Sequence, residues 1–417
     1  MSNYSLSLHG LATVFSLEVK QRLRSKRWIV ALIAWFLFVG GLTWLGMTIV
    51  WMQEQSLGTG YANFTRDAGP TAFSLIMLFV LGMGIVVAPM FTATSINGDR
   101  GQNTLAVLQA TRLSALEITF GKLLAAIAAA TTFLAVALPF IIWTMFIGNV
   151  SAWQLLVSFL VLLVEVAVVC AVGLGWSAVF NRTAGSVTFT YLSLLFITVM
   201  LPIIMMLCTP FVAQAEKAQY WGMSYEDELA FKDEVYKWET ENPWAYENSD
   251  FSKAPVVDPS KFGWHSTDVG IDHTERIWWM LAPNPFMVLA DATPHAPAYG
   301  VDPDYEERDT MSALRSMMYA VKYPYRYDED HTSDYYNSIG YSVGPDGQGG
   351  VVATRDDGSR IIVDTPVTPL WRRANHSGET WPWALGFYAL VGIGFLLLAT
   401  SRLSIPYHRL AKGTRVA

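Results

Sequence analysis

The sequence is poor in charged residues and in cysteine. Only 15% of its 417 residues are Asp, Glu, Lys or Arg, whereas 52% are hydrophobic. Soluble domains usually carry about a quarter charged residues, so this composition excludes an ordinary soluble protein and predicts a chain partly solvated by lipid. The two cysteines, Cys170 and Cys208, both lie in apolar segments, which excludes a disulfide framework.

Three further signatures are absent. No G-x-x-x-x-G-K-[S/T] run occurs, because Gly121-Lys122 lacks the upstream glycine and the following Ser or Thr, so the chain has no P-loop for ATP hydrolysis. The sequence also lacks a Ser-His-Asp or Cys-His signature, either of which would indicate an enzyme. The first apolar run, residues 28–51, is too long for a signal-peptide core and no small-residue cleavage site follows, so we expect a retained anchor.

Six apolar stretches are long enough to cross a bilayer, which takes roughly 20 mostly apolar residues. They predict an all-α polytopic membrane protein with about six transmembrane helices. The stretches are residues 28–51, 70–96, 118–147, 153–180, 186–208 and 382–400.

Basic residues are distributed unevenly around these stretches. Of the 28 Lys and Arg residues, 14 lie within residues 209–381 and 14 lie outside that segment. With a cytoplasmic N-terminus, 13 of the latter 14 would face the cytoplasm and only Arg66 would not. The positive-inside rule favours this arrangement. We therefore predict a multi-pass plasma-membrane protein with both termini in the cytoplasm.

Residues 1–27 predict an amphipathic helix ahead of the first span. Apolar residues recur at spacings of three or four, and basic residues follow from Lys20 to Arg27. Such a helix would lie in the inner headgroup layer with its cations toward anionic lipid. An ordinary basic flank would explain the charges but not the apolar stripe, which consists of Leu8, Leu11, Phe15, Val19 and Leu23.

Residues 209–381 differ in composition from the rest of the chain. They hold 29 of the 35 acidic residues and 13 of the 18 tyrosines. Their aromatic and aliphatic content is too high for a disordered segment, so we predict a folded α+β extracytoplasmic domain inserted between helices 5 and 6. The expected helices are 224–238 and 306–321, and the expected strands are 339–343, 350–355 and 360–364.

One apolar piece of this insertion, residues 277–289, is too short to span a bilayer. Its length is typical of an interfacial or re-entrant segment, with Trp278 and Trp279 at headgroup level. A buried core element of the outer domain is the alternative interpretation.

The loop between the second and third spans, residues 97–122, contains a predicted short amphipathic helix. This helix covers residues 102–111, with Leu105 and Leu108 on one side. A short helix parallel to the membrane has the shape needed to dock into a groove of a soluble partner. Covering lipid headgroups is the alternative role for such a helix.

This loop resembles the coupling region of ABC-2 type permeases, the membrane subunits of type V ABC transporters. That family pattern has an acidic residue, a Gly-Thr-Leu step, a Leu-rich turn, a Thr-Pro-Leu-Ser step and a Gly-Lys pair opening the third span. The matching positions are Asp99, Thr104-Leu105, Leu108, Thr111, Leu113-Ser114 and Gly121-Lys122.

Other parts of the chain extend the resemblance. Glu18-Val19-Lys20 and Leu23-Arg24-Ser25 are similar to the first helix of the family, and Asn284-Pro285-Phe286 is similar to its segment just outside the membrane. The resemblance covers residues 1–208 and about 277–401. Asn103 and Arg112 depart from it, standing where the family usually has Gly and Pro.

The resemblance implies export driven by ATP hydrolysis on a separate ABC ATPase subunit, which would hold the ATP and Mg while this chain holds no cofactor. It also implies a homodimer or a heterodimer with a similar permease. We expect an amphipathic, lipid-like or drug-like substrate, contacts with membrane lipids and no nucleic-acid partner. The residues implied to couple to the ATPase are Asp99, Thr104, Leu105, Leu108, Thr111 and Lys122.

Glu165 is the acidic residue deepest within a predicted span. A carboxyl group in a membrane is costly and indicates function by default, here in the translocation path. The alternative is a protonated group hydrogen-bonded to Thr190 or Ser193. Pro89 and Pro202 would kink their helices along the same path. We expect Trp278, Trp279, Asn284, Pro285 and Phe286 to form an outer gate.

Two interpretations compete with a permease. A membrane-anchored extracytoplasmic enzyme or sensor would place the chemistry in residues 209–381, but an anchor has no need of the 97–122 loop. A proton-coupled transporter would use Glu165, without an internal repeat to support it. Two clusters of metal-capable side chains, at 265–273 and 328–334, have no recognised ligand spacing, and we expect no metal site.

Overall fold

The computed structural model describes residues 7–57, 61–102, 104–105, 113–148, 150–244, 253, 255, 261–294, 309–322, 341–345, 351–355, 360–363 and 379–404. The chain forms two compact units. The membrane unit comprises Met1–Leu207, Ile277–Tyr319 and Gly378–Ala417, and the insertion unit comprises Cys208–Arg276 and Ala320–Ser377.

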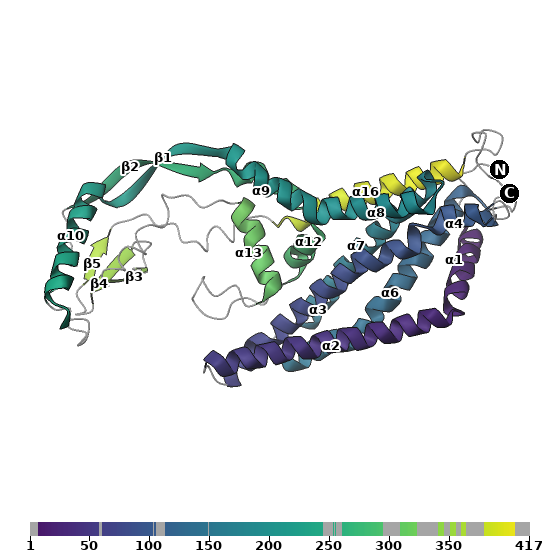
Figure 1. Cartoon of the computed structure of the whole chain (residues 1–417), viewed down its shortest axis with the longest axis horizontal. Coiled ribbons are helices and arrows are strands. Elements are labelled where there is room, and N and C mark those ends of the chain that lie inside the picture. Colours follow the sequence, from purple (N-terminus) through teal and green to yellow (C-terminus); the bar gives the residue numbers. More distant parts are fainter. Residues whose placement is uncertain are drawn as a thin grey trace. The chain divides into compact units, whose positions relative to one another are not determined.

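Within the described residues, six helical segments are long and apolar enough to cross a bilayer: Trp28–Thr48, Ala68–Gly101, Ala115–Ile147, Ala152–Val179, Thr183–Val212 and Trp381–Leu403. They are built from α2 (Lys26–Leu57), α3 (Tyr61–Thr92) with α4 (Ser95–Gly101), α6 (Ala115–Ile147), α7 (Ala152–Val179), α8 (Thr183–Leu195) with α9 (Leu201–Val212), and α16 (Trp381–Leu403) (Figure 1). The chain is therefore a multi-pass membrane protein.

Helix α7 is the centre of the membrane unit and contacts α3, α6, α8 and α16. Its Leu162 and Leu174 are buried together with Phe73 and Leu81 of α3. The outward surfaces of the spans are apolar as well. Large hydrophobic side chains such as Phe146 are exposed in the isolated chain. Apolar residues on both sides of a helix are typical of a bundle solvated by lipid.

Helix α1 (Leu8–Leu23) precedes the first span and packs along α6 (Figure 1). Ser7 caps its first turn by accepting a hydrogen bond from the Gly10 amide at 3.0 Å. At the same end of the bundle, Thr400 near the end of α16 donates to Thr119 near the start of α6 at 3.5 Å. The starts of α1 and α6 and the end of α16 therefore share one end of the membrane unit.

Residues 277–289 form part of the membrane unit. A 3₁₀ turn, Trp278–Met280, leads into the short helix α12 (Pro285–Ala292), which contacts α3, α7 and α16. Val288, Leu289 and Ala290 are almost fully buried there. This position does not fit the alternative interpretation of the segment as a core element of the insertion. Helix α13 (Thr310–Lys322) belongs to the membrane unit as far as Tyr319.

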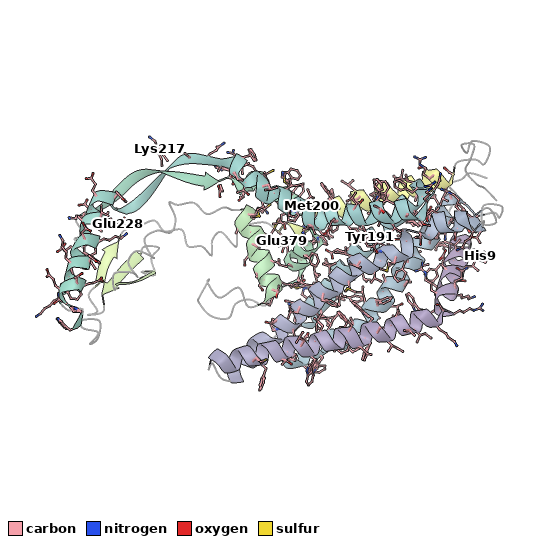
Figure 2. All side chains as sticks on the ribbon, viewed as in Figure 1. His9, Tyr191, Met200, Lys217, Glu228 and Glu379 are labelled. Carbon is pink, nitrogen blue, oxygen red and sulfur yellow. The ribbon has the colours of Figure 1, made fainter. Side chains whose placement is uncertain are left out.

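The insertion unit combines two antiparallel sheets with one described long helix. Strands β1 (Ala213–Met223) and β2 (Phe262–Asp272) pair from Ala213↔Asp272 to Met223↔Phe262, and α10 (Tyr225–Glu241) lies between them in sequence. Strands β3 (Tyr341–Pro345), β4 (Val351–Arg355) and β5 (Arg360–Val363) form a three-stranded meander. Lys217 of β1 and Glu228 of α10 are labelled in Figure 2.

The expected fold class is confirmed: six apolar helices with an α+β insertion between the fifth and the sixth. The β1–β2 hairpin was not predicted from the sequence. Strand β1 begins Ala-Gln-Ala-Glu-Lys-Ala, a run of residues with low strand propensity whose alternation of apolar and polar positions breaks at Glu216-Lys217.

Candidate functional site

Helix α1 approaches the first turns of α6 closely, and two glycines permit the contact. A Cβ atom added at Gly121 would lie 2.7 Å from the Cβ atom of Val14, and one added at Gly10 would lie 2.6 Å from the Cδ atom of Glu117. Both distances are shorter than real Cβ contacts. Glycine is the residue that allows such an approach of a backbone to its neighbour.

Lys122 is buried next to this contact and joins three helices. Its Nζ atom lies 2.5 Å from Oε1 of Glu18 in α1 and 2.6 Å from Oδ2 of Asp99 in α4, and it donates to the Ser95 carbonyl at 3.3 Å. The residue is only 2% exposed. An unpaired ammonium group buried this deeply would cost several kcal/mol, and the two carboxylates offset that cost. We name Glu18, Asp99 and Lys122 the ionic junction.

Arg22 extends the ionic junction by one turn of α1. Its guanidinium lies 3.7 Å from Glu18, over the ring of Phe91 at 5.2 Å, and donates to the carbonyls of Phe91 and Ala125 at 3.4 and 3.5 Å. Burial lowers the pKa of the Arg22 guanidinium, and the Glu18 carboxylate acts in the opposite direction. Arginine remains charged, so two cations and two anions balance in this cluster.

Glu117 links the starts of two helices. One carboxylate oxygen accepts from the Ser7 amide of α1 at 2.7 Å, and the other accepts from the Ser114 amide at 2.8 Å. The Glu117 amide in turn donates to the Ser114 hydroxyl at 3.2 Å, which completes a capping box at the start of α6. A single carboxylate therefore ties α1 to the point where the 97–122 loop re-enters the bundle.

Helix α4 is held to the end of α7 by backbone contacts. The amides of Ile96 and Asn97 donate to the Ser177 hydroxyl at 2.9 and 3.2 Å. Further along the loop, the Thr104 hydroxyl donates to the Asp99 carbonyl at 3.2 Å. Asp99 thus meets Lys122 through its side chain and Thr104 through its backbone.

The expected docking stripe of Leu105 and Leu108 needs correction. Leu105 is 5% exposed and belongs to the hydrophobic core of the membrane unit, so it has almost no apolar surface left to offer to a partner. Its burial anchors the loop instead. Leu108 and Thr111 lie outside the described residues.

Asn284 connects α12 to the fifth span. Its Oδ1 atom accepts from the Phe286 amide at 3.0 Å and caps α12, while its Nδ2 atom donates to the Thr198 carbonyl at 2.9 Å. In a regular helix that carbonyl would accept from residue 202, but Pro202 has no N–H. The helix forms a π turn over Phe196–Met200 at this point, a feature common at functional sites.

Glu165 lies 2% exposed on the wall of a cavity of about 40 Å³. Neither carboxylate oxygen has a hydrogen-bond partner among the described residues. The hydroxyls of Thr190 and Ser193 donate to the carbonyls of Ser186 and Phe189, and in this structure neither hydroxyl is hydrogen-bonded to Glu165. The cavity is lined by Ile85, Glu165, Val168, Val169, Val172, Leu194, Ile197, Thr198, Pro285, Phe387, Tyr388 and Val391.

The other expected path and gate residues are only partly brought together. Pro285 lines the Glu165 cavity, and Phe286 packs near Gly82 of α3. Trp279 is exposed and Trp278 is half-buried in the turn before α12. Pro89 lies in the last turn of α3 and is not among the residues that line this cavity.

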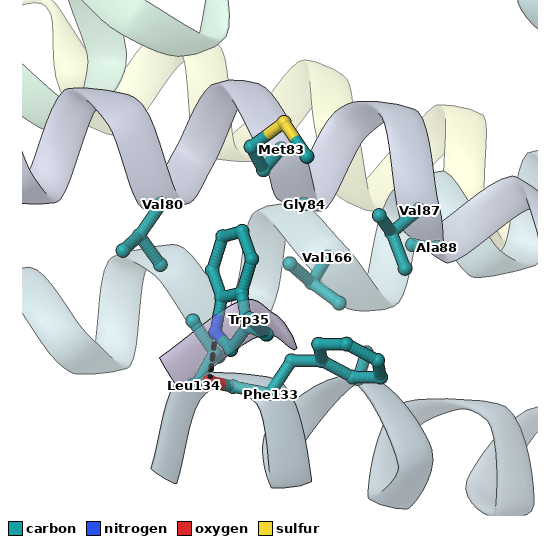
Figure 3. A pocket seen from close by; sticks show the side chains of 10 residues that line it. Trp35, Val80, Met83, Gly84, Val87, Ala88, Phe133, Leu134 and Val166 are labelled. Atoms are coloured by element: carbon teal, nitrogen blue, oxygen red, sulfur yellow. Dashed lines mark hydrogen bonds between the residues drawn. The ribbon is translucent and has the colours of Figure 1, made fainter. Parts of the chain in front are cut away.

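A second cavity, of about 20 Å³, lies between α2, α3, α6 and α7 (Figure 3). Its lining is apolar, and the Trp35 indole beside it donates to the Phe133 carbonyl at 2.9 Å. It contains no titratable side chain, which makes it a packing gap rather than a site of chemistry.

The expected metal-capable cluster at 265–273 includes His265 and Asp268, which belong to strand β2. His273 follows β2 and contacts Glu275, with Nδ1 and Oε1 2.6 Å apart. The cluster at 328–334 lies outside the described residues.

Sequence reasoning missed two residues that the structure brings to the site. Glu117 was recognisable, because Ser114-Ala115-Leu116-Glu117 is a capping-box pattern directly before an apolar run. Tyr388, which lines the Glu165 cavity and donates to the Pro283 carbonyl at 2.7 Å, carries no local signal in its apolar span.

Comparison with known proteins identifies the family. The model of the ABC-2 family transporter proteins matches residues 12–238, which is more than half of the chain. No curated protein and no solved structure matches the chain. The match includes α1 from residue 12 onward, the 97–122 loop and the first five spans, and therefore the whole ionic junction. The chain belongs to the ABC-2 family of transporter proteins and is a membrane-spanning permease of an ABC transporter.

Proposed function

We propose that this permease exports an amphipathic, lipid-like or drug-like substrate across the plasma membrane, driven by ATP hydrolysis on a separate ABC ATPase subunit. Membership of the ABC-2 family supports the partnership with an ATPase. ATP and Mg would be held by that subunit. The permease would act as a homodimer or as a heterodimer with a similar chain.

The bundle end that carries the ionic junction would face the cytoplasm. The supporting observation is the distribution of basic residues: of the 14 Lys and Arg residues outside 209–381, 13 fall on that side in this topology. The insertion unit would then lie outside the cell. The same orientation brings the 97–122 loop to the side where ATP is available.

The ionic junction is the observation that carries the coupling proposal. A force on the loop reaches α4, and Asp99 passes it through Lys122 to α6 and through Glu18 to α1. The Lys122 side chain is buried and the two carboxylates are only partly exposed, so water weakens these contacts less than it weakens surface ion pairs. The loop, the interfacial helix and the third span would therefore move as one body when the ATPase closes.

On the opposite side, α12 would act as the outer gate. Asn284 joins α12 to the π turn of the fifth span, where Pro202 has removed a helical hydrogen bond. A span interrupted in this way bends more easily than a regular helix. Movement of the third span would then open the path past Pro285 and Phe286, with Trp278 and Trp279 at the membrane surface.

Asp99→Asn tests the coupling step in the complex with the ATPase reconstituted in vesicles. It weakens the contact of α4 with Lys122 without changing side-chain size. We expect ATP hydrolysis to continue while transport per ATP falls by about 2- to 30-fold, which corresponds to a coupling change of roughly 0.5–2 kcal/mol.

Asp227→Asn is the matched control, because Asp227 makes a partly exposed ion pair with Lys261 at 3.4 Å in the insertion unit. It should leave transport per ATP unchanged. Equal transport per ATP in Asp99→Asn and wild type would contradict the coupling role. Failure of any ATPase subunit to co-purify with the wild-type chain would favour the membrane-anchored enzyme or sensor instead.

A further inference from the structure

The Glu165 cavity combines a buried carboxylate with apolar and aromatic walls. Both carboxylate oxygens are buried and without a hydrogen-bond partner among the described residues. The polar groups beside them are already used: the Tyr388 hydroxyl donates to the Pro283 carbonyl and the Thr198 hydroxyl to the Leu194 carbonyl. No Lys, Arg or His lines the cavity. The described lining residues therefore supply no counter-charge there.

An ionised carboxylate is expensive to bury, so Glu165 would carry its charge only while a ligand or a partner compensates it. The lining indicates which ligand that would be. Phe387 and Tyr388 line the cavity together with Glu165, and apart from Thr198 the remaining lining residues are aliphatic. Aromatic rings with a nearby anion are the arrangement that proteins use for alkylated ammonium groups.

We propose that the Glu165 cavity binds the alkylammonium group of an amphipathic molecule, either a lipid headgroup or a free amphipathic amine. A cavity of about 40 Å³ holds a small cationic group and not a whole amphiphile. The apolar remainder of the ligand would lie along the exposed surface beside the cavity, where the lining residue Phe387 is 39% exposed. The site names the substrate class of the proposed exporter and in that respect rests on the proposed function.

The position of the cavity suits release toward the outer gate. Pro285 of α12 and Thr198 of the π turn both line it, and the Thr198 carbonyl is held by Asn284. Movement of α12 would shift two walls of the cavity at once and expose the carboxylate.

Direct binding tests the site without relying on transport. The full chain with its ATPase subunit is placed in nanodiscs of phosphatidylglycerol, and radiolabelled dodecyltrimethylammonium is the probe, with empty discs subtracted. The competitor is the uncharged isostere in which carbon replaces nitrogen. Wild type should favour the ammonium probe over the isostere by about tenfold or more, and Glu165→Gln should remove this preference.

Two further variants separate charge from structure. Glu165→Asp keeps the charge and should keep the preference at reduced affinity. Val164→Gln introduces the same amide on a neighbouring exposed position of α7 and should bind as wild type does. Thermal unfolding of each complex shows that the variants are folded.

A second set of nanodiscs, made of phosphatidylcholine, shows whether the alkylammonium group comes from a lipid headgroup or from a free amine. If phosphatidylcholine discs weaken probe binding to wild type but not to Glu165→Gln, a lipid headgroup is the ligand; equal binding in both discs assigns a free amine. A wild-type protein that does not discriminate the probe from its isostere, or a folded Glu165→Gln protein that still does, overturns the proposal. Retained discrimination without any ATP-driven transport would overturn the exporter function and leave the site standing.

Discussion

Lys122 and Glu165 are two ionisable residues, both 2% exposed, in one membrane-spanning bundle, and their surroundings are opposite. Lys122 has two carboxylates within 2.6 Å, contributed by two other helices. Glu165 has no partner among the described residues and lies on a cavity wall. The chain thus compensates the buried Lys122 ammonium with its own carboxylates and supplies no such partner for the Glu165 carboxyl group among the described residues.

This difference suggests different roles for the two residues: Lys122 would transmit movement between helices, and Glu165 would bind a ligand. A charge whose partners come from neighbouring helices holds those helices together, and its removal should be felt as lost stability and lost coupling. A carboxyl group buried without a hydrogen-bond partner costs stability in the empty protein, and a ligand that pairs with it would offset that cost. Stability and ligand binding should therefore respond in opposite ways at the two positions.

The largest effect is expected for Lys122→Met, which leaves Glu18 and Asp99 facing each other in a buried site. Breaking a buried ion pair by removing one partner costs roughly 3–5 kcal/mol. We expect a strongly lowered unfolding temperature of the purified chain. The triple variant Glu18→Gln, Asp99→Asn, Lys122→Met removes all three charges and should recover most of the loss.

Lys232→Met is the matched control for that experiment, because Lys232 makes an exposed ion pair with Glu228 at 2.6 Å on α10. It should change the unfolding temperature little. A triple variant as unstable as Lys122→Met alone would mean that the packing of the lysine side chain matters and its charge does not.

The next largest effect is expected at the junction of α12 with the fifth span. Asn284→Ala removes the cap of α12 and leaves the Thr198 carbonyl without its donor, for a loss of about 2 kcal/mol. Pro202→Ala restores an N–H that can reach the same carbonyl. The two changes should be non-additive in a double-mutant cycle of thermal stability, with the pair more stable than the sum predicts. Simple additivity would show that Pro202 is unrelated to the Asn284 contact.

Most of the fold could be predicted from the sequence because the strongest signal in it is hydropathy. Apolar runs as long as a bilayer is thick identify spans directly, and the six expected spans agree with the structure to within a few residues. The β1–β2 hairpin has no comparable signal. Its pairing is a contact between residues as far apart as Ala213 and Asp272, and the local composition of β1 disfavours a strand.

The candidate site was less predictable, because its key contacts join distant helices. The pattern around Asp99 and Lys122 was visible in the loop. Nothing in the local sequence shows that Lys122 contacts Asp99 and also Glu18, which is 104 residues away. Leu105 shows the converse. Its periodicity indicates an apolar face, but periodicity cannot distinguish a face that meets a partner from one that packs on its own chain, as Leu105 does.

Glu165→Gln sharpens the comparison because the change in stability that we expect from it is opposite in sign to that of Lys122→Met. Replacing the unpartnered carboxylate with an amide should leave the empty protein as stable as wild type or more stable, by about 0.5–2 kcal/mol. The measurement is thermal unfolding of both proteins in the same detergent without added amphiphile. A large loss of stability would mean that Glu165 has a structural partner and is not a binding residue.

The smallest effect is expected at Glu275, a carboxylate outside the membrane-spanning helices that is itself partnered. Its Oε1 atom lies 2.6 Å from Nδ1 of His273. Burial raises the pKa of the Glu275 carboxyl, but the hydrogen bonds from His273 and from its own backbone together with the His273 and Arg276 charges outweigh it, so the net pKa is lowered. A lowered folded pKa gives stability that is present above the unfolded pKa and is lost as the pH falls through the folded value.

Glu275→Gln should therefore destabilise the turn after β2 at neutral pH, by less than about 1 kcal/mol because the carboxylate is partly exposed, and should have no effect in strong acid. The readout is the hydrogen-exchange protection of the His273 amide, which donates to the Val212 carbonyl at 3.3 Å, corrected for intrinsic rates at each pH. Glu228→Gln, on the exposed face of α10, should leave this amide unchanged. A difference between wild type and Glu275→Gln that is the same at neutral and acidic pH would show that the side chain acts through packing and not through its charge.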